Sequence, residues 1–140
     1  MKALKALAIA LTVYVCIVVA FETLVVVMGK RQAEHGVGPD EKFIVITTTD
    51  SNGSRDTVIG SVDLDGKTYV AANHWPRGWY DRAVAHPDVE ITRAGERAPY
   101  HPVIVDGDER DRVAAGYRLP FAVRFLTGFP PRSYLRLDPR

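Results

Sequence analysis

The chain has 140 residues, of which 46% are apolar and 25% charged, and this composition is typical of one folded domain rather than of a disordered segment. Its formal net charge is +1. Beyond residue 29, sixteen basic residues balance sixteen acidic ones, because Lys2, Lys5 and Glu22 are the charged residues of the first 29. A neutral domain lacks the positive field that nucleic-acid binding requires, so we expect no nucleic-acid partner. Cys16 is the single cysteine and the four histidines have no ligand spacing, so we also expect no disulfide and no metal site.

The N-terminal segment, residues 6–28, is predominantly apolar. As a helix with a rise of ~1.5 Å per residue, these 23 residues would extend roughly 35 Å, enough to cross a ~30 Å hydrocarbon core with some tilt. We therefore expect residues 1–29 to form a single-pass anchor in the cell membrane, with its lipid contacts at 6–28. A cleaved signal peptide ending near Ala20 is the alternative, but its apolar region would normally have only ~7–15 residues.

Glu22 interrupts this run, and two interpretations stay open. It lies at the membrane interface, hydrated or protonated, or it contacts a neighbouring membrane subunit, because carboxylates inside a membrane usually have partners. The membrane orientation does not follow from charge, since Lys2 and Lys5 at one end are balanced by Lys30 and Arg31 at the other.

Residues 30–42 are polar, contain two glycines and a proline, and are expected to be a linker. After them, runs rich in β-branched and aromatic residues alternate with turn residues such as Asp65-Gly66. Strands are predicted at residues 43–49, 57–64, 67–72, 89–93, 98–106 and 134–137, and short helices at 78–85, 108–115 and 121–127. Six strands with peripheral helices predict a mainly-β domain over residues 43–140, a small closed or half-open antiparallel barrel.

The turn after the first strand is one candidate binding segment. Thr49, Ser51, Gly53 and Ser54 offer hydroxyl and backbone NH groups, and Arg55 follows them directly. Such a turn can hold a phosphate. An ordinary hairpin is the alternative, and it explains the same residue types.

A second candidate segment runs from residue 71 to 87. The third predicted strand ends in Ala71, Ala72 and Asn73, small residues that would let a planar ring approach the backbone. Arg77, Trp79 and Tyr80 then follow at the entry to a short helix. The alternative is that both aromatic side chains belong to the core.

Four stretches together resemble a known family. They are Thr47-Thr48-Thr49 with its turn and Arg55, then KTYVAANHWPRGWYDRAVAHPDVEI at 67–91, DGDERDRV at 106–113 and SYLRLDP at 133–139. Over residues 43–139 the chain resembles the deazaflavin-dependent nitroreductases, a branch of the split-barrel flavin reductases. The resemblance implies a six-stranded split β-barrel and the deazaflavin coenzyme F-420, with FMN as a second option. It also implies hydride transfer to a quinone, such as a menaquinone, or to a nitro compound, and several members associate with membranes.

The turn departs from the family pattern, which is roughly G-R-K-x-G. Here it is Asp50-Ser51-Asn52-Gly53-Ser54, with an acid where cations are expected. Charge-assisted bonds to phosphate contribute roughly 1.5–3 kcal/mol each, so the loss of two would weaken coenzyme binding by two to four orders of magnitude. Arg55 and Arg77 are the residues expected to compensate.

Two functions therefore stay open. One is a membrane-anchored reductase whose barrel faces the cytoplasm, with Tyr80 or Tyr117 as proton donor. The other is an accessory subunit of a membrane complex, such as one of the respiratory chain, which binds no cofactor and uses the barrel for docking. A flavin- or haem-binding barrel is a third alternative.

Overall fold

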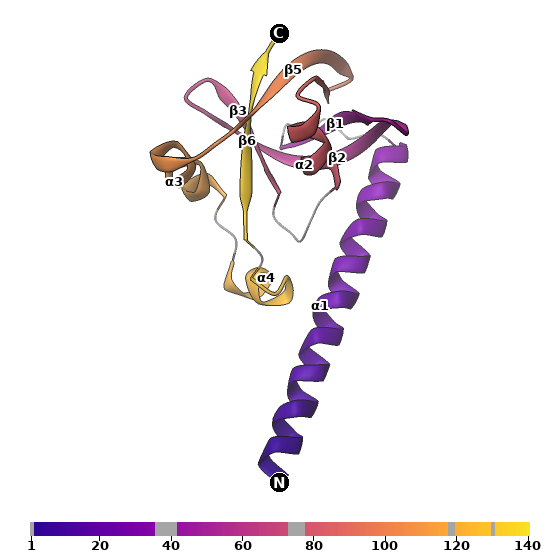
Figure 1. Cartoon of the computed structure of the whole chain (residues 1–140), viewed down its shortest axis with the longest axis vertical. Helices are drawn as coiled ribbons and strands as arrows, with labels where there is room; N and C mark the ends of the chain where they lie inside the picture. The colour runs from indigo at the N-terminus through magenta and orange to yellow at the C-terminus, as the bar shows by residue number, and fades with distance from the viewer. Residues whose placement is uncertain (1, 36–41, 73–77, 118–119, 130) are drawn as a thin grey trace.

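The structure is a computed structural model that describes residues 2–35, 42–72, 78–117, 120–129 and 131–140. It consists of a β-barrel with short helices around it and one long helix, α1 (Lys2–His35), that extends well beyond the barrel (Figure 1).

Six antiparallel strands close the barrel. They are β1 (Phe43–Asp50), β2 (Gly53–Leu64), β3 (Lys67–Ala72), β4 (Val89–Arg93), β5 (Glu96–Ile104) and β6 (Ser133–Pro139). Their order around the barrel is β1-β2-β3-β6-β5-β4, and the pairing of β4 with β1 completes the ring. The predicted six-stranded antiparallel barrel is therefore confirmed, and it is closed.

Three strands begin earlier than the sequence predicts: β2 by four residues, β5 by two and β6 by one. β2 begins at Gly53 because the ladder with β1 continues through the pairs Thr49–Ser54 and Asp50–Gly53. β5 begins at Glu96 because Ala94 and Gly95 both have positive φ, 50° and 85°, and make a tight hairpin. The residues before each predicted start are polar, so hydrophobic periodicity alone did not mark them as strand.

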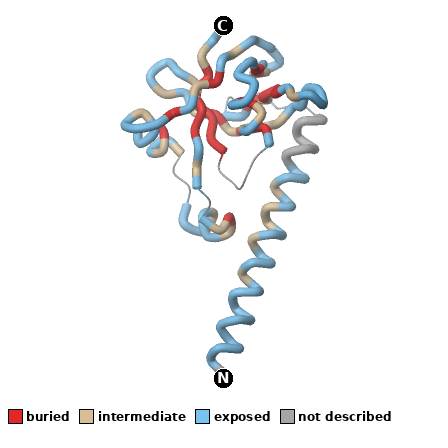
Figure 2. The backbone as a smooth tube through the Cα atoms, viewed as in Figure 1, coloured by how far each residue is buried: buried red, intermediate tan, exposed pale blue. Residues whose placement is uncertain are grey.

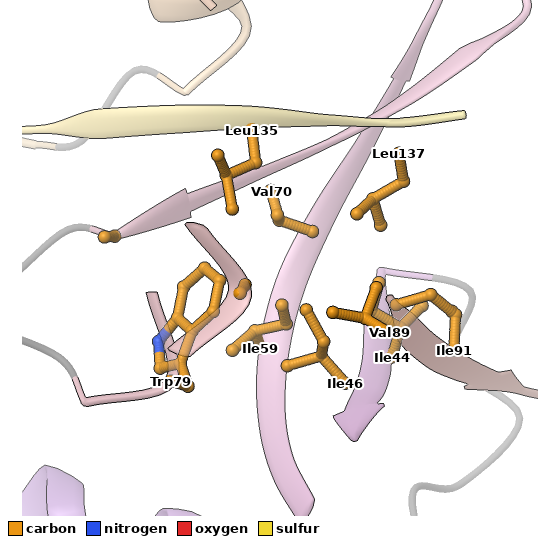
Figure 3. Close-up of a cluster of buried hydrophobic side chains, with 11 residues drawn as sticks. Ile44, Ile46, Ile59, Val70, Trp79, Val89, Ile91, Leu135 and Leu137 are labelled. Atoms are coloured by element: carbon orange, nitrogen blue, oxygen red, sulfur yellow. The ribbon is translucent and has the colours of Figure 1, made fainter. Parts of the chain in front are cut away.

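The barrel interior is the main core. It contains Ile44, Ile46, Ile59, Val70, Leu135 and Leu137, and Trp79 and Ala83 of α2 (Gly78–Ala85) pack against these side chains (Figure 3). Strand β3 alternates as a pleated strand should. Val70 and Ala72 belong to this inner cluster, and Tyr69 and Ala71 belong to a second cluster with Val113 of α3 (Gly107–Gly116).

The long helix is apolar and exposed over most of its length (Figure 2). Its segment Ala3–Met28 is long and apolar enough to cross a membrane, and none of its most hydrophobic window is buried. The helix continues past residue 29 to His35, into the segment expected to be a linker. A short helix, α4 (Phe121–Leu126), lies beside the middle of α1 (Figure 1).

Candidate functional site

The predicted phosphate-binding residues meet at the tip of the β1–β2 hairpin, where they are exposed to solvent. They do not all lie on one face. Thr49 and Ser54 are cross-strand partners whose hydroxyl oxygens are 2.9 Å apart. Arg55 pairs with Thr48, and cross-strand partners project to the same side of a sheet. Arg55 therefore projects to the side opposite Thr49 and Ser54, while Ser51 and Gly53 lie at the turn between them.

The carboxylate of Asp50 is hydrogen-bonded to the backbone of its own turn. Oδ1 of Asp50 accepts a hydrogen bond of 2.7 Å from the backbone NH of Asn52. That NH is one of the groups that would otherwise be available to a phosphate oxygen, and the carboxylate adds a negative charge beside it. The expected weakness of this turn as an anion site therefore has a structural basis.

The sequence interpretation missed an arginine that contacts Thr48, the cross-strand partner of Arg55. Nε of Arg82, on α2, donates a hydrogen bond of 2.9 Å to Oγ1 of Thr48, which is fully buried. Gly78 leaves room for this guanidinium, because a Cβ at Gly78 would lie 3.0 Å from Nη1 of Arg82. Positions 78 and 82 are one helical turn apart, so their proximity follows from helix geometry, but no spacing in the sequence signals the bond to Thr48.

Arg55 and Arg82 are thus on the same side of Thr48. Arg55 is its cross-strand partner on β2, and Arg82 is bonded to it from α2. Two cations that flank one residue are a candidate anion site, which the turn alone is not.

The second predicted segment is divided between the two clusters. Ala72 and Trp79 are in the inner core, 7% and 5% exposed, whereas Ala71 is in the outer cluster under α3. Tyr80 packs against the inner core, its ring edge-on to Trp79 at 5.9 Å. Asn73 and Arg77 lie outside the described residues. Trp79 therefore lies in the core, as the alternative interpretation had it. Its role in holding a coenzyme ring stays a prediction.

The two candidate proton donors lie in different clusters. Tyr80 is with the inner core and Tyr117 with the outer one. The hydroxyl of Tyr117 donates a hydrogen bond of 2.7 Å to the backbone carbonyl of Tyr69. Burial raises the pKa of Tyr117 well above its usual value, and the nearby Tyr134 and Asp63 raise it further. Catalysis by either tyrosine stays a prediction. The hydrogen bond of Tyr117 to the Tyr69 carbonyl gives that residue a structural role.

A further polar cluster joins α3 to the barrel. Glu109 of α3 accepts a hydrogen bond from Tyr69 at 2.8 Å and pairs with Arg136 at 3.0 Å, which fastens α3 to β3 and β6. The Tyr69 hydroxyl, followed by Arg136, lowers the pKa of Glu109. Among the residues that the structure describes, no three His, Cys, Asp or Glu side chains are grouped to hold a metal ion.

No family model and no curated protein matches the chain. Solved structures do. An F420-H2 dependent reductase is 22% identical, with a TM-score of 0.57 over 74% of this chain and 100% of its own. The haem storage protein HutZ of Vibrio cholerae is 17% identical, with a TM-score of 0.52 over 72% and 83% of the two chains. An FAD-binding protein of Mesorhizobium loti is 7% identical, with a TM-score of 0.51 over 73% and 82%.

At these identities the likeness establishes the fold. The barrel over residues 43–139 has the split-barrel architecture found in deazaflavin, flavin and haem proteins. The resemblance inferred from the sequence is confirmed at that level.

The described residues offer cationic groups of the kind that bind an anion on one side of the hairpin only. Arg55 and Arg82 supply two cations there, while Asp50 and the occupied NH of Asn52 make the tip itself unfavourable. An anionic group would therefore be held on the α2 side of Thr48.

Proposed function

We propose that this protein is a membrane-anchored reductase of the split-barrel type that uses the deazaflavin coenzyme F-420. The observation that carries the proposal is the barrel itself, which matches the entire length of an F420-H2 dependent reductase and places two arginines beside Thr48. The apolar helix α1 would hold this barrel at the bilayer, where a menaquinone-like acceptor is dissolved.

In this proposal the protein's residues bind and orient the coenzyme. Arg55 and Arg82 hold its phosphate and acidic tail, with Arg77 as a further cation, and Ala72 with Trp79 borders the ring. When bound, the coenzyme supplies the hydride that reduces the acceptor. We assign the proton donor to Tyr80 rather than to Tyr117, because the hydroxyl of Tyr117 already donates a hydrogen bond to the Tyr69 carbonyl.

Titration of the full-length chain in nanodiscs with coenzyme F-420, followed by coenzyme fluorescence, tests the proposal. We expect saturable binding at micromolar concentrations. Arg55→Ala and Arg82→Ala should each weaken it about ten- to a hundredfold, the equivalent of one charge-assisted bond of roughly 1.5–3 kcal/mol. Arg97→Ala is the matched control, because Arg97 pairs with Glu90, which projects with Thr47 to the face of the sheet opposite Thr48.

The hairpin tip supplies a second test. Asp50→Arg combined with Asn52→Lys removes the internal carboxylate contact and adds two cations, so it should tighten coenzyme binding. No change in affinity would show that the phosphate does not approach this hairpin.

A second candidate function has a specific observation in its favour. The carboxylate of Asp50 occupies the turn where the related reductases are expected to have cations. A barrel that has lost the coenzyme could be an accessory subunit of a membrane complex, such as a respiratory one, with Glu22 contacting a neighbouring subunit. In that case the wild-type chain shows no saturable coenzyme binding, and mild-detergent purification recovers partner subunits in fixed ratio.

A further inference from the structure

The helix α4 is attached to the apolar helix α1. The hydroxyl of Tyr14 donates a hydrogen bond of 3.0 Å to the carbonyl of Phe125, and the two rings are 4.8 Å apart. Gly128 approaches Val18 so closely that a Cβ on the glycine would lie 3.3 Å from Cγ1 of the valine. In Figure 1 the two helices lie side by side at the middle of α1.

Three aromatic side chains on and after α4 are exposed. Phe121 is 71% exposed, Phe125 44% and Phe129 46%. Their rings form one group, with centroids 6.3 Å apart for Phe121 and Phe125 and 5.8 Å apart for Phe121 and Phe129. A contiguous group of exposed phenylalanines is unfavourable in water and marks a surface that another apolar phase covers.

The position of α4 along α1 places this group at a defined depth. A hydrocarbon core of ~30 Å takes about 20 residues of helix, whereas the apolar span Ala3–Met28 has 26, so the edge of the core on the barrel's side lies between Glu22 and Met28. Val18 is four to ten residues before that edge, which at ~1.5 Å per residue is about 6–15 Å inside it. Interfacial helices bury their apolar face about 5–10 Å into the same boundary.

The exposure of α1 to solvent also changes where α4 lies against it. From Ala3 to Val13 every residue is exposed, whereas Tyr14, Val18, Phe21, Glu22 and Val25 are half-buried. These five residues share one face of the helix, since each lies three or four positions from another of them. The first half of the span is therefore free for lipid on all sides, and the second half has protein on one side.

The charges around α4 suit the headgroup region. Between Gly116 and Ser133 the sequence has three arginines and no acid, although the chain as a whole is nearly neutral. The guanidinium of Arg124 lies 5.5 Å from the centre of the Phe129 ring. A long basic side chain there can reach the phosphates while its stem and the rings stay in the apolar layer.

We propose that α4 is a second membrane-contacting element, which inserts Phe121, Phe125 and Phe129 into the leaflet on the barrel's side. This proposal rests on the anchoring of α1 and adds to it. It fixes the barrel upright against the membrane instead of leaving it on a flexible tether, so that the end of the barrel near α4 faces the lipid.

Depth-dependent fluorescence quenching in liposomes tests the proposal on the full-length chain. A bimane probe is attached in turn to the native Cys16 and, in a Cys16→Ala background, to Ala122→Cys on α4 or to Glu96→Cys at the start of β5. Lipids that carry a nitroxide on the acyl chain then serve as quenchers. We expect quenching of the probes at 16 and 122 and none at 96. Phe121→Ser combined with Phe129→Ser should abolish quenching at 122, and the control Val84→Ser, another exposed apolar residue, should not.

The probe on Cys16 separates the two claims. Quenching at 16 without quenching at 122 would retain the anchor and overturn the insertion of α4, and a probe at 122 shielded by a second copy of the chain would give this result. Absence of quenching at both positions would overturn the anchor and the insertion together.

Discussion

Removal of one hydroxyl group, by Tyr117→Phe, distinguishes a structural from a catalytic role of this residue. The variant keeps the ring, which packs 5.7 Å from Tyr134, and loses the 2.7 Å hydrogen bond to the Tyr69 carbonyl. Because that bond is partly buried, its loss should lower the free energy of unfolding by about 1–2 kcal/mol. Coenzyme affinity and turnover should change little, since Tyr117 lies in the outer cluster and not beside Trp79.

The pH dependence gives this prediction a second readout. The pKa of Tyr117 is raised in the folded state, whereas in the unfolded chain it has the usual value near 10. The stabilising effect of the neutral form is therefore complete below pH 10 and is lost as the pH rises through the raised value. The stability difference between wild type and Tyr117→Phe should accordingly shrink in alkaline solution.

Urea unfolding of the full-length chain in detergent, followed by the fluorescence of the buried Trp79, measures both effects. Tyr80→Phe is the control for stability alone, because its hydroxyl makes no hydrogen bond to any residue the structure describes. Its turnover should fall, since Tyr80 is the proposed proton donor. Unchanged stability together with a large loss of turnover in Tyr117→Phe would refute the structural role and make this tyrosine the proton donor.

Three further predictions concern the barrel surface, the α4 contact and the membrane. Arg93, 2.9 Å from Asp63, lowers the pKa of that carboxyl, so Asp63→Asn should cost on the order of 0.2–1 kcal/mol in urea unfolding at neutral pH. Because this stabilisation is lost as pH falls through the lowered pKa, the two proteins should become equal in strong acid; a constant gap would contradict the pairing. Gly128→Ala should cost roughly 1–2 kcal/mol in the same assay, since residue 128 has a φ of 75° and its Cβ would press on Val18; an unchanged midpoint would refute the close contact. A reporter fused after Arg140 should behave as cytoplasmic, where the coenzyme would be available, and extracytoplasmic activity would leave only the accessory-subunit function.

Local patterns were enough to predict most of the barrel. β3, α2 and β4 have the predicted bounds, because alternating apolar residues, Asp65-Gly66 and Pro87 mark them within a few positions. The starts of β2 and β5 did not follow from the sequence, since they depend on which polar residues face a neighbouring strand. Pairing across a sheet is not visible in a single strand's periodicity.

The candidate site was less predictable, for a related reason. The sequence placed Thr49, Ser54 and Arg55 at one hairpin, but only the register shows that Arg55 projects to the side opposite the other two. The bond between Arg82 and Thr48 joins residues 34 positions apart and could not be inferred from spacing. The attachment of α4 to α1 joins residues 111 positions apart.

Oxidation of reduced coenzyme F-420 by the full-length chain, in nanodiscs that contain menaquinone, tests the proposed reductase function most directly. We predict that the absorbance of the oxidised coenzyme recovers with multiple turnovers, and that Arg55→Ala raises the coenzyme concentration needed for half-maximal rate. A rate no higher than that of nanodiscs without the protein would contradict the proposed function.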